Sequence, residues 1–200
     1  MQEAGGMGRK LEFNYDRALE RATRVFWAKG YVSASMRDLL KAMGIGEGSF
    51  YHLFGSKKRL YLACLKHYNG VVTKRRVDAL AAEPSVRKGV RAFFRTVLDE
   101  LDNPRTPRVC LLAQSLSEDV MEESGLKTYV TVQMAGFEGF FTERLRQATK
   151  SGELPPDFPA EVTAEIIVTY LQGFFRVIQV LKNREQMWQQ TETLLTSLGL

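Results

Sequence analysis

The sequence predicts an all-α protein that consists of a small basic N-terminal domain and a larger C-terminal helical domain. Apolar residues recur at the three- and four-residue spacing of helices in one segment after another, and the chain has no alternating strand pattern and no internal repeat. Charge is distributed unevenly, because residues 1–80 contain 15 Lys and Arg against 7 Asp and Glu, whereas residues 81–200 contain 13 against 16. We therefore expect a polyanion to bind at the N-terminal end of the molecule only.

Composition narrows the class of protein. Of the 200 residues, 44% are apolar and 26% are charged, which is typical of compact domains with a substantial core. The chain has no run of about 18 apolar residues and no apolar N-terminal stretch, so we expect a cytoplasmic protein without a membrane span or signal peptide. Cys64 and Cys110 have neither the number nor the spacing of a disulfide framework or a zinc site, which predicts reduced thiols and no metal or cofactor.

The chain is expected to begin with a flexible arm over 1–13, which contains three glycines and little periodicity. A helix follows in NYDRALERATRVFWAKG, where Asn14 can cap the N-terminus and Gly30 can end the helix. One face of this helix is apolar and consists of Ala18, Ala22, Val25 and Phe26.

A second, shorter helix is predicted in SASMRDLLKAMG. Ser35 and Asp38 have the spacing of a capping box, and Gly44 suits the position after the last helical residue. The glycines of the following GIGEG stretch are spaced as in a nucleotide-binding loop, but such a loop requires a strand before its first glycine. Because a helix precedes them here, we interpret these glycines as turn and cap residues of a helix-turn-helix.

The third helix begins near Glu47 and occupies the place of the helix that enters the major groove of DNA. Its apolar residues Phe50, Leu53 and Phe54 are expected to face the core of the domain, whereas Ser49, Tyr51 and His52 are expected to point outward. Three cations follow in GSKKRL, beside a helix N-terminus that Ser56 can cap. Each residue alone is typical of a solvated surface, but the combination predicts DNA binding.

Further helices are predicted up to the C-terminus, and proline-containing loops separate several of them. Their expected ranges are 57–82, 86–101, 109–119, 126–151, 160–183 and 184–197. We expect the change from the first domain to the second within the 57–82 helix.

The stretch SMRDLLKAMGIGEGSFYHLFGSKKRLYLACL, with RALERATRVFWAKGY before it, resembles the N-terminal domain of the TetR family of transcriptional regulators. The motif covers about residues 17–65, and the remainder matches the family mainly in length and helical content. The resemblance implies a three-helix helix-turn-helix DNA-binding domain over 14–65 and a larger C-terminal helical domain for ligand binding and dimerisation over 66–200. It also implies a repressor that binds a palindromic operator in double-stranded DNA as a homodimer and is released by a small-molecule inducer.

By position, the resemblance implies base or phosphate contacts from Arg37, Glu47, Ser49 and His52, and phosphate contacts from Tyr51 and Lys57. Two positions depart from the family pattern, because Gly46 stands where a serine is frequent and Glu47 where a basic or neutral polar residue is frequent. An acidic residue repels phosphate, yet it can accept a hydrogen bond from cytosine N4 or simply complement the helix dipole. The predicted DNA-binding residues are Ser35, Arg37, Gly46, Glu47, Gly48, Ser49, Tyr51, His52, Lys57 and Lys58.

The segment AEVTAEIIVTYLQGFFRVIQVLKN is apolar around much of its circumference, which predicts a helix that is buried on several sides. Together with the following helix it can form a four-helix dimer interface. It can equally belong to the core of its own chain, because periodicity does not distinguish a partner from the chain itself. The residues predicted at the dimer interface are Ile166, Tyr170, Gly173, Phe174, Val177, Ile178, Leu181, Trp188 and Leu195.

A pocket for a largely apolar inducer is expected in the C-terminal domain, because aromatic residues are numerous there. At any single position, an aromatic residue at helical spacing is more typical of a plain core. The candidate ligand-binding residues are Phe94, Leu98, Cys110, Gln114, Met134, Phe137, Phe141 and Phe174.

Two alternatives remain open. VCLLAQSLSED resembles a GCL segment of TetR regulators that sense electrophiles or oxidants, and Arg105 and Arg108 near Cys110 favour a thiolate; a small, buried and inert Cys110 is the other interpretation. Ser85 and Lys88 match an S-x-x-K pattern without its partner motifs, so we expect no enzyme. A helical enzyme, or a helical protein that binds a small molecule but no DNA, is the second alternative.

Overall fold

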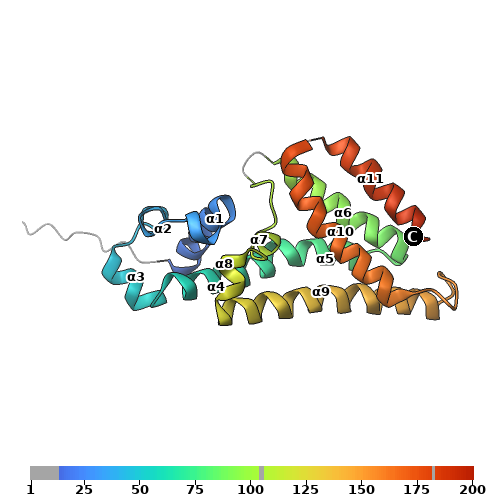
Figure 1. Cartoon of the computed structure of the whole chain (residues 1–200), viewed down its shortest axis with the longest axis horizontal. Coiled ribbons are helices and arrows are strands. Elements are labelled where there is room, and N and C mark those ends of the chain that lie inside the picture. Colours follow the sequence, from blue (N-terminus) through green and yellow to red (C-terminus); the bar gives the residue numbers. More distant parts are fainter. Residues whose placement is uncertain (1–13, 104–105, 182) are drawn as a thin grey trace, which may run out of the picture.

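The computed structural model describes residues 14–103, 106–181 and 183–200, so the predicted arm over 1–13 lies outside the described residues. The described residues form helices and no strand, which confirms the all-α class (Figure 1). The N-terminal domain contains α1 (Tyr15–Ser33), α2 (Met36–Met43) and α3 (Glu47–Phe54). A long helical connection follows, which consists of α4 (Lys57–Tyr68), the π-helical η1 (Asn69–Thr73) and α5 (Lys74–Ala81). The C-terminal part adds α6 (Val86–Asp102), α7 (Leu111–Gln114), α8 (Glu118–Glu122), α9 (Ser124–Lys150), α10 (Ala160–Leu181) and α11 (Arg184–Ser197).

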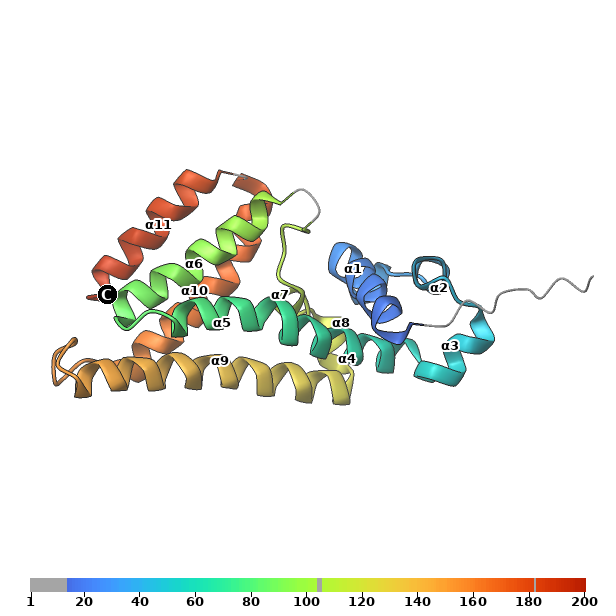
Figure 2. The same ribbon diagram turned by 180° about the vertical axis from the view of Figure 1, so that it is seen from behind.

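The molecule is elongated, with α1 to α3 at one end and α6, α9, α10 and α11 at the other (Figures 1 and 2). α4 packs against α1 in the N-terminal domain, and its continuation α5 packs against α6 in the C-terminal domain. α9 packs against α10, and α11 packs against α6. The connection from α4 to α5 therefore belongs to the cores of both domains.

Local signals begin the N-terminal helices where the sequence predicts, and Gly44 ends α2 there. α1 does not end at the predicted Gly30: it extends to Ser33, and Gly30 interrupts it as a kink with φ of 80°. The side-chain oxygens of Asn14, Ser35 and Ser56 each accept a hydrogen bond from the backbone N–H three residues later, at 2.9 to 3.1 Å. Ser35 and Asp38 form a complete capping box, and Gly44 ends α2 in the left-handed region with φ of 71°. The helix-turn-helix is thus specified by cap and turn residues within the segment itself.

The core of the N-terminal domain is built from Phe26, Leu39, Phe50 and Leu60, whose side chains are fully buried. The expectation that Leu53 joins this core is wrong, because Leu53 is 38% exposed. α3 has only eight residues and a single buried side, which Phe50 and Phe54, one helical turn apart, already occupy.

The helix predicted over 57–82 is continuous but contains the π-helical segment η1, which the sequence did not indicate. Asn69 at the start of η1 donates hydrogen bonds from Nδ2 to the Tyr129 hydroxyl at 2.9 Å and to Gln133 Oε1 at 3.0 Å, both on α9. These contacts with a distant helix favour the wider π turn at this place.

The single helix predicted over 109–119 is wrong, because the structure has a four-residue helix, α7, and a separate helix, α8. The segment is anchored to the other domain: the indole N–H of Trp27 donates to the Val109 carbonyl, and the hydroxyls of Tyr61 and Ser115 share a hydrogen bond of 2.7 Å. These long-range contacts therefore interrupt the segment, although the helical period of its sequence predicts one continuous helix.

α10 is apolar on two sides, one of which is buried in the core. The buried residues include Leu171, Phe174, Phe175 and Ile178. Length and hydropathy alone would allow α10 to cross a membrane, with a mean hydropathy of 1.3 over an 18-residue stretch of which 39% is buried. Core helices of globular proteins pass the same test, and here the apolar character follows from the two apolar sides. The second side is exposed and consists of Val162, Ile166, Val177, Val180 and Leu181.

Candidate nucleic-acid interface

The outer side of α3 is polar and accessible. Tyr51 is 52% exposed, and Ser49 and His52 are also exposed, whereas Phe50 between them is fully buried. At the helix N-terminus Gly46, Glu47 and Gly48 are exposed, and a Cβ atom added at either glycine would meet no atom within 4 Å. The free N–H groups of the first turn are thus open to an anion, as phosphate binding at a helix N-terminus requires.

α2 contributes an exposed cation and a rigid cap to the same end of the molecule. Arg37 in the first turn of α2 is exposed. Hydrogen bonds from Lys29 and then from Ser35 lower the pKa of the Asp38 carboxyl to about 2. The Ser35 hydroxyl is held in the capping box, donating to Asp38 Oδ2 at 2.7 Å, so a DNA contact from Ser35 would compete with this bond.

The two lysines at the start of α4 differ in their partners. Nζ of Lys57 donates to the Val32 carbonyl at 3.2 Å and lies 5.0 Å from the centre of the Tyr31 ring, and burial lowers the Lys57 pKa. Nζ of Lys58 forms an ion pair of 2.7 Å with Glu123, which lies between α8 and α9. Lys57 therefore stays within the N-terminal domain, whereas Lys58 links it to the C-terminal domain.

A groove of about 700 Å³ separates α1 from α3 and extends the polar face of α3. Its lining includes His52 and Ser49 from α3 and two cations of α1, Arg17 and Arg21. The sequence reasoning did not include these arginines among the DNA-binding residues. Their four-residue spacing on a helix of the basic first third places both on one face and would have marked them as candidates.

The predicted ligand-binding residues fall into two groups. Phe94, Leu98, Phe141 and Phe174 are at most 2% exposed and pack into the core of the C-terminal domain, where Phe94 lies 6.1 Å from Phe174 between ring centres. The others are closer to the surface or to a domain boundary: Met134 is half-buried, Phe137 lines a groove of about 270 Å³ between α5 and α9, and Gln114 lies against Gly30 of α1.

Cys110 is 7% exposed and lies in a buried polar cluster. Its Sγ accepts from the Tyr68 hydroxyl at 3.4 Å and from Nη1 of Arg76 at 3.8 Å. Arg105 lies outside the described residues and Arg108 is exposed, so the cation in contact with the thiol is Arg76 instead. Among the described residues, no group of three or more His, Cys, Asp or Glu side chains could hold a metal ion.

Cys64 is fully buried in α4, and desolvation raises the pKa of its thiol to about 12. The sequence interpretation of Cys64 as a packing residue agrees with this environment.

The residues predicted at a dimer interface also divide by exposure. Phe174, Ile178 and Leu195 are at most 3% exposed within the protomer, and Tyr170 is held by a hydrogen bond of 2.9 Å with Thr191. Trp188 is half-buried, and the Arg95 guanidinium lies over its ring. Four of the predicted residues are exposed and so could contact a partner: Ile166, Gly173, Val177 and Leu181.

The chain belongs to the TetR family of bacterial regulatory proteins. The family model described as "Bacterial regulatory proteins, tetR family" matches residues 18–64, and the model described as "Tetracyclin repressor-like, C-terminal domain" matches residues 87–194. The combination of helix-turn-helix and helical C-terminal domain thus identifies a DNA-binding transcriptional regulator.

Relatives and solved structures agree with this assignment. The chain is 32% identical over 148 residues to the uncharacterized HTH-type transcriptional regulator YezE of Bacillus subtilis (strain 168), which covers 74% of this chain and 76% of YezE. It is 26% identical over 167 residues to the HTH-type transcriptional repressor ComR of Escherichia coli (strain K12), which covers 83% and 80% of the two chains. Among structures, a cysteine mutant of the TetR family transcriptional regulator CifR, in complex with 26 bp double-strand operator DNA, superposes with a TM-score of 0.87 at 31% identity and covers 94% of this chain and 98% of CifR.

Proposed function

We propose that this regulator is a repressor that binds a palindromic operator as a homodimer and leaves it when a small molecule binds. The observation that carries the proposal is the exposed polar face of α3, with Ser49, Tyr51 and His52, in the basic domain of the chain. Its similarity to CifR, which was solved with operator DNA, and to relatives named as repressors supports the same function.

Dimerisation follows from the apolar side of α10 that the protomer leaves uncovered. Ile166, Val177 and Leu181 are 36 to 42% exposed on this helix, and Gly173 between them offers no side chain that would hold a second helix away. Two copies joined through this side would present two α3 helices to DNA. A dimeric helix-turn-helix protein reads two half-sites roughly 34 Å apart, which is one helical turn of DNA.

Release requires a ligand that binds better to one arrangement of the two DNA-binding domains than to the other. In one arrangement the distance between the two α3 helices does not match the half-sites of the operator. A ligand that binds this arrangement better shifts the protein away from the DNA-bound form and lowers its affinity for the operator. The helix from α4 to α5 belongs to both domains and transmits the change.

The test is a selection of random duplex DNA by the purified protein, followed by sequencing of the enriched pool. We expect a palindrome whose half-site centres are separated by about one helical turn. Binding that is weak, salt-sensitive and without an enriched sequence would contradict the proposal, because nonspecific contacts with phosphates behave in this way.

A transcription assay with the selected site placed across a promoter then tests repression. We expect less transcript when the protein is added, and a variant with His52→Ala should lose this effect on the same template. An increase in transcript would contradict the assignment as a repressor.

A further inference from the structure

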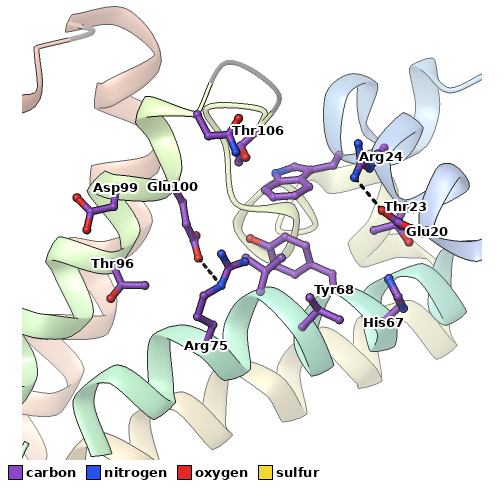
Figure 3. A pocket seen from close by; sticks show the side chains of 14 residues that line it. Glu20, Thr23, Arg24, His67, Tyr68, Arg75, Thr96, Asp99, Glu100 and Thr106 are labelled. Atoms are coloured by element: carbon purple, nitrogen blue, oxygen red, sulfur yellow. Dashed lines mark hydrogen bonds and ion pairs between the residues drawn. The ribbon is translucent and has the colours of Figure 1, made fainter. Parts of the chain in front are cut away.

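A cleft of about 630 Å³ lies at the junction of the two domains. Thr23 of α1 lies on one side, Tyr68 and Arg75 of the long connection lie on the floor, and Thr96 and Glu100 of α6 lie on the opposite side (Figure 3). Trp27 of α1 also lines the cleft. Its volume falls within the range of about 300 to 1,000 Å³ that is usual for small-molecule sites. None of the four core residues predicted to bind a ligand lines it.

Glu100 of α6 presents a carboxylate oxygen that accepts no hydrogen bond from the described residues of this cleft. Its side chain is 7% exposed, and Oε2 accepts from Nε of the buried Arg76 at 2.8 Å. Oε1 is buried and forms an ion pair with Nε of Arg75 at 3.4 Å (Figure 3), but it accepts no hydrogen bond from a described residue. The ion pair with Arg75 leaves the hydrogen-bonding capacity of this buried oxygen unfilled, so a ligand that supplies an O–H or N–H group at this point gains a strong hydrogen bond.

The remainder of the cleft is suited to an apolar body of low charge. The rings of Trp27 and Tyr68 meet edge to face with 5.0 Å between their centres, and Val71 and Val72 lie beside them. The cations of the lining are compensated, because Arg24 pairs with Glu20 at 2.7 Å and Arg75 pairs with Glu100 at 3.4 Å. Asp99 of the lining pairs with Arg184 of α11 at 2.6 Å. The lining therefore has no uncompensated cation that would select an anionic ligand.

We propose that this interdomain cleft is the effector site and that its ligand is a small amphiphilic molecule with an aromatic or other apolar body and one hydroxyl or amine group. The hydroxyl or amine donates to Oε1 of Glu100, and the apolar body lies against Trp27 and Tyr68. This inference rests on the proposed function, because it assigns a site and a ligand class to the small molecule that releases the operator.

The position of the cleft explains how its occupant would affect DNA binding. Trp27 belongs to α1 of the DNA-binding domain, and its indole N–H donates to the Val109 carbonyl in the segment that follows α6. Under this proposal a ligand between α1 and α6 contacts Trp27 and so bears on this hydrogen bond, and α1 in turn packs against α4. The orientation of the DNA-binding domain relative to the C-terminal domain is thus coupled to occupancy.

Three probes of matched size test the ligand class: benzyl alcohol, benzylamine and benzoate. The first two carry a donor, whereas ionised benzoate carries acceptors only. The readout is the ¹⁵N-labelled indole N–H resonance of Trp27 in the full-length protein, assigned by its loss in Trp27→Phe. We expect each donor probe to shift this resonance in a saturable manner. The affinity for a donor probe should exceed the affinity for benzoate about tenfold or more, because one good hydrogen bond contributes a difference of that size.

Thr96→Met on α6 and Thr128→Met on α9 form a matched pair of variants. Each threonine donates to the carbonyl four residues earlier in its helix, but only Thr96 lines the cleft. We expect Thr96→Met, which fills the cleft, to weaken probe binding about tenfold or more, and Thr128→Met to leave it unchanged. Equal binding of all three probes, no saturable Trp27 shift, or equal effects of the two variants would overturn the proposal.

Operator affinity with and without a saturating donor probe separates this proposal from the proposed function. We expect the probe to lower the affinity in the wild type and in Thr128→Met, and to have little effect in Thr96→Met. If the protein binds its operator tightly but the probe does not change the affinity, the cleft is not the effector site while the repressor assignment stands. If no operator exists, the proposed function fails even where the probe binds.

Discussion

At the scale of the residue, we propose that side chains of α3 and of the neighbouring ends of α2 and α4 recognise DNA in different ways. Tyr51 and Lys57 have the position and chemistry of phosphate contacts, whereas His52 and Arg37 carry donors that can reach base edges. A phosphate contact adds affinity on every sequence, but a base contact adds affinity only on the correct one. This difference is measurable.

We expect Tyr51→Phe and Lys57→Ala to weaken binding to the operator and to random duplex DNA by similar factors. Lys57→Ala should also reduce the slope of log affinity against log salt by about 0.9, because one phosphate contact is lost. His52→Ala and Arg37→Ala should instead change the sequences that a selection enriches.

Lys66→Ala is the control for charge, since Lys66 is exposed later on the same helix, α4. Affinities are measured by fluorescence anisotropy at several salt concentrations. Equal losses on operator and random DNA for all four variants would contradict the division into phosphate and base contacts.

At the scale of the element, the helix-turn-helix depends on its caps. Ser35 closes the N-terminus of α2 in a capping box in which each partner bonds to the other's backbone N–H. α2 has only eight residues, so a lost cap is a large fraction of its stabilisation.

Ser35→Ala should therefore lower the free energy of unfolding by about 1 kcal/mol. Urea denaturation followed by circular dichroism measures this change, and Ser33→Ala, an exposed serine at the end of α1, is the matched control. A loss as large in Ser33→Ala would show that the cap is not the cause.

The packing of α5 against α6 encloses an ion pair between Arg76 and Glu100, both of which have side chains at most 7% exposed. Arg76→Met should lower the free energy of unfolding by about 3 to 5 kcal/mol, because the Glu100 carboxylate stays buried without its partner. Arg75 also approaches Glu100, at 3.4 Å, but its side chain is 57% exposed. Arg75→Met should therefore cost less than about 1 kcal/mol.

Thermal and urea unfolding of the two variants test the difference. Similar stabilities of Arg76→Met and Arg75→Met would mean that water reaches Glu100 more freely than its burial indicates.

At the scale of the whole molecule, we propose that the exposed side of α10 joins the two chains that bind DNA. Val177→Asp would place a charge without a partner in the proposed interface and should raise the dimer dissociation constant about a hundredfold or more. Sedimentation velocity measures the oligomeric state, and operator affinity should fall with the loss of dimer.

Val132→Asp is the matched control, because Val132 is 58% exposed on α9, outside the proposed interface. If both variants remain dimeric at the same concentration as the wild type, the interface lies elsewhere on the molecule.

The sequence alone determined the helical class, the helix-turn-helix and the family. Cap residues such as Ser35, Gly44 and Ser56 act on neighbours within a few positions, so their effect is visible in any window of the sequence. The basic first third and the outward position of Ser49, Tyr51 and His52 follow from composition and from the period of one helix.

Only the tertiary structure decided the features that depend on residues far apart in the chain. The break between α7 and α8 results from contacts of residues 109–115 with Trp27 and Tyr61, and η1 results from contacts with α9. Lys58 pairs with Glu123, 65 positions further along the chain. Glu100 faces a cleft whose opposite side belongs to α1, which is also far away in the sequence. The helical period shows which face of a helix is apolar and which is polar, but the partner of each face depends on how the helices pack.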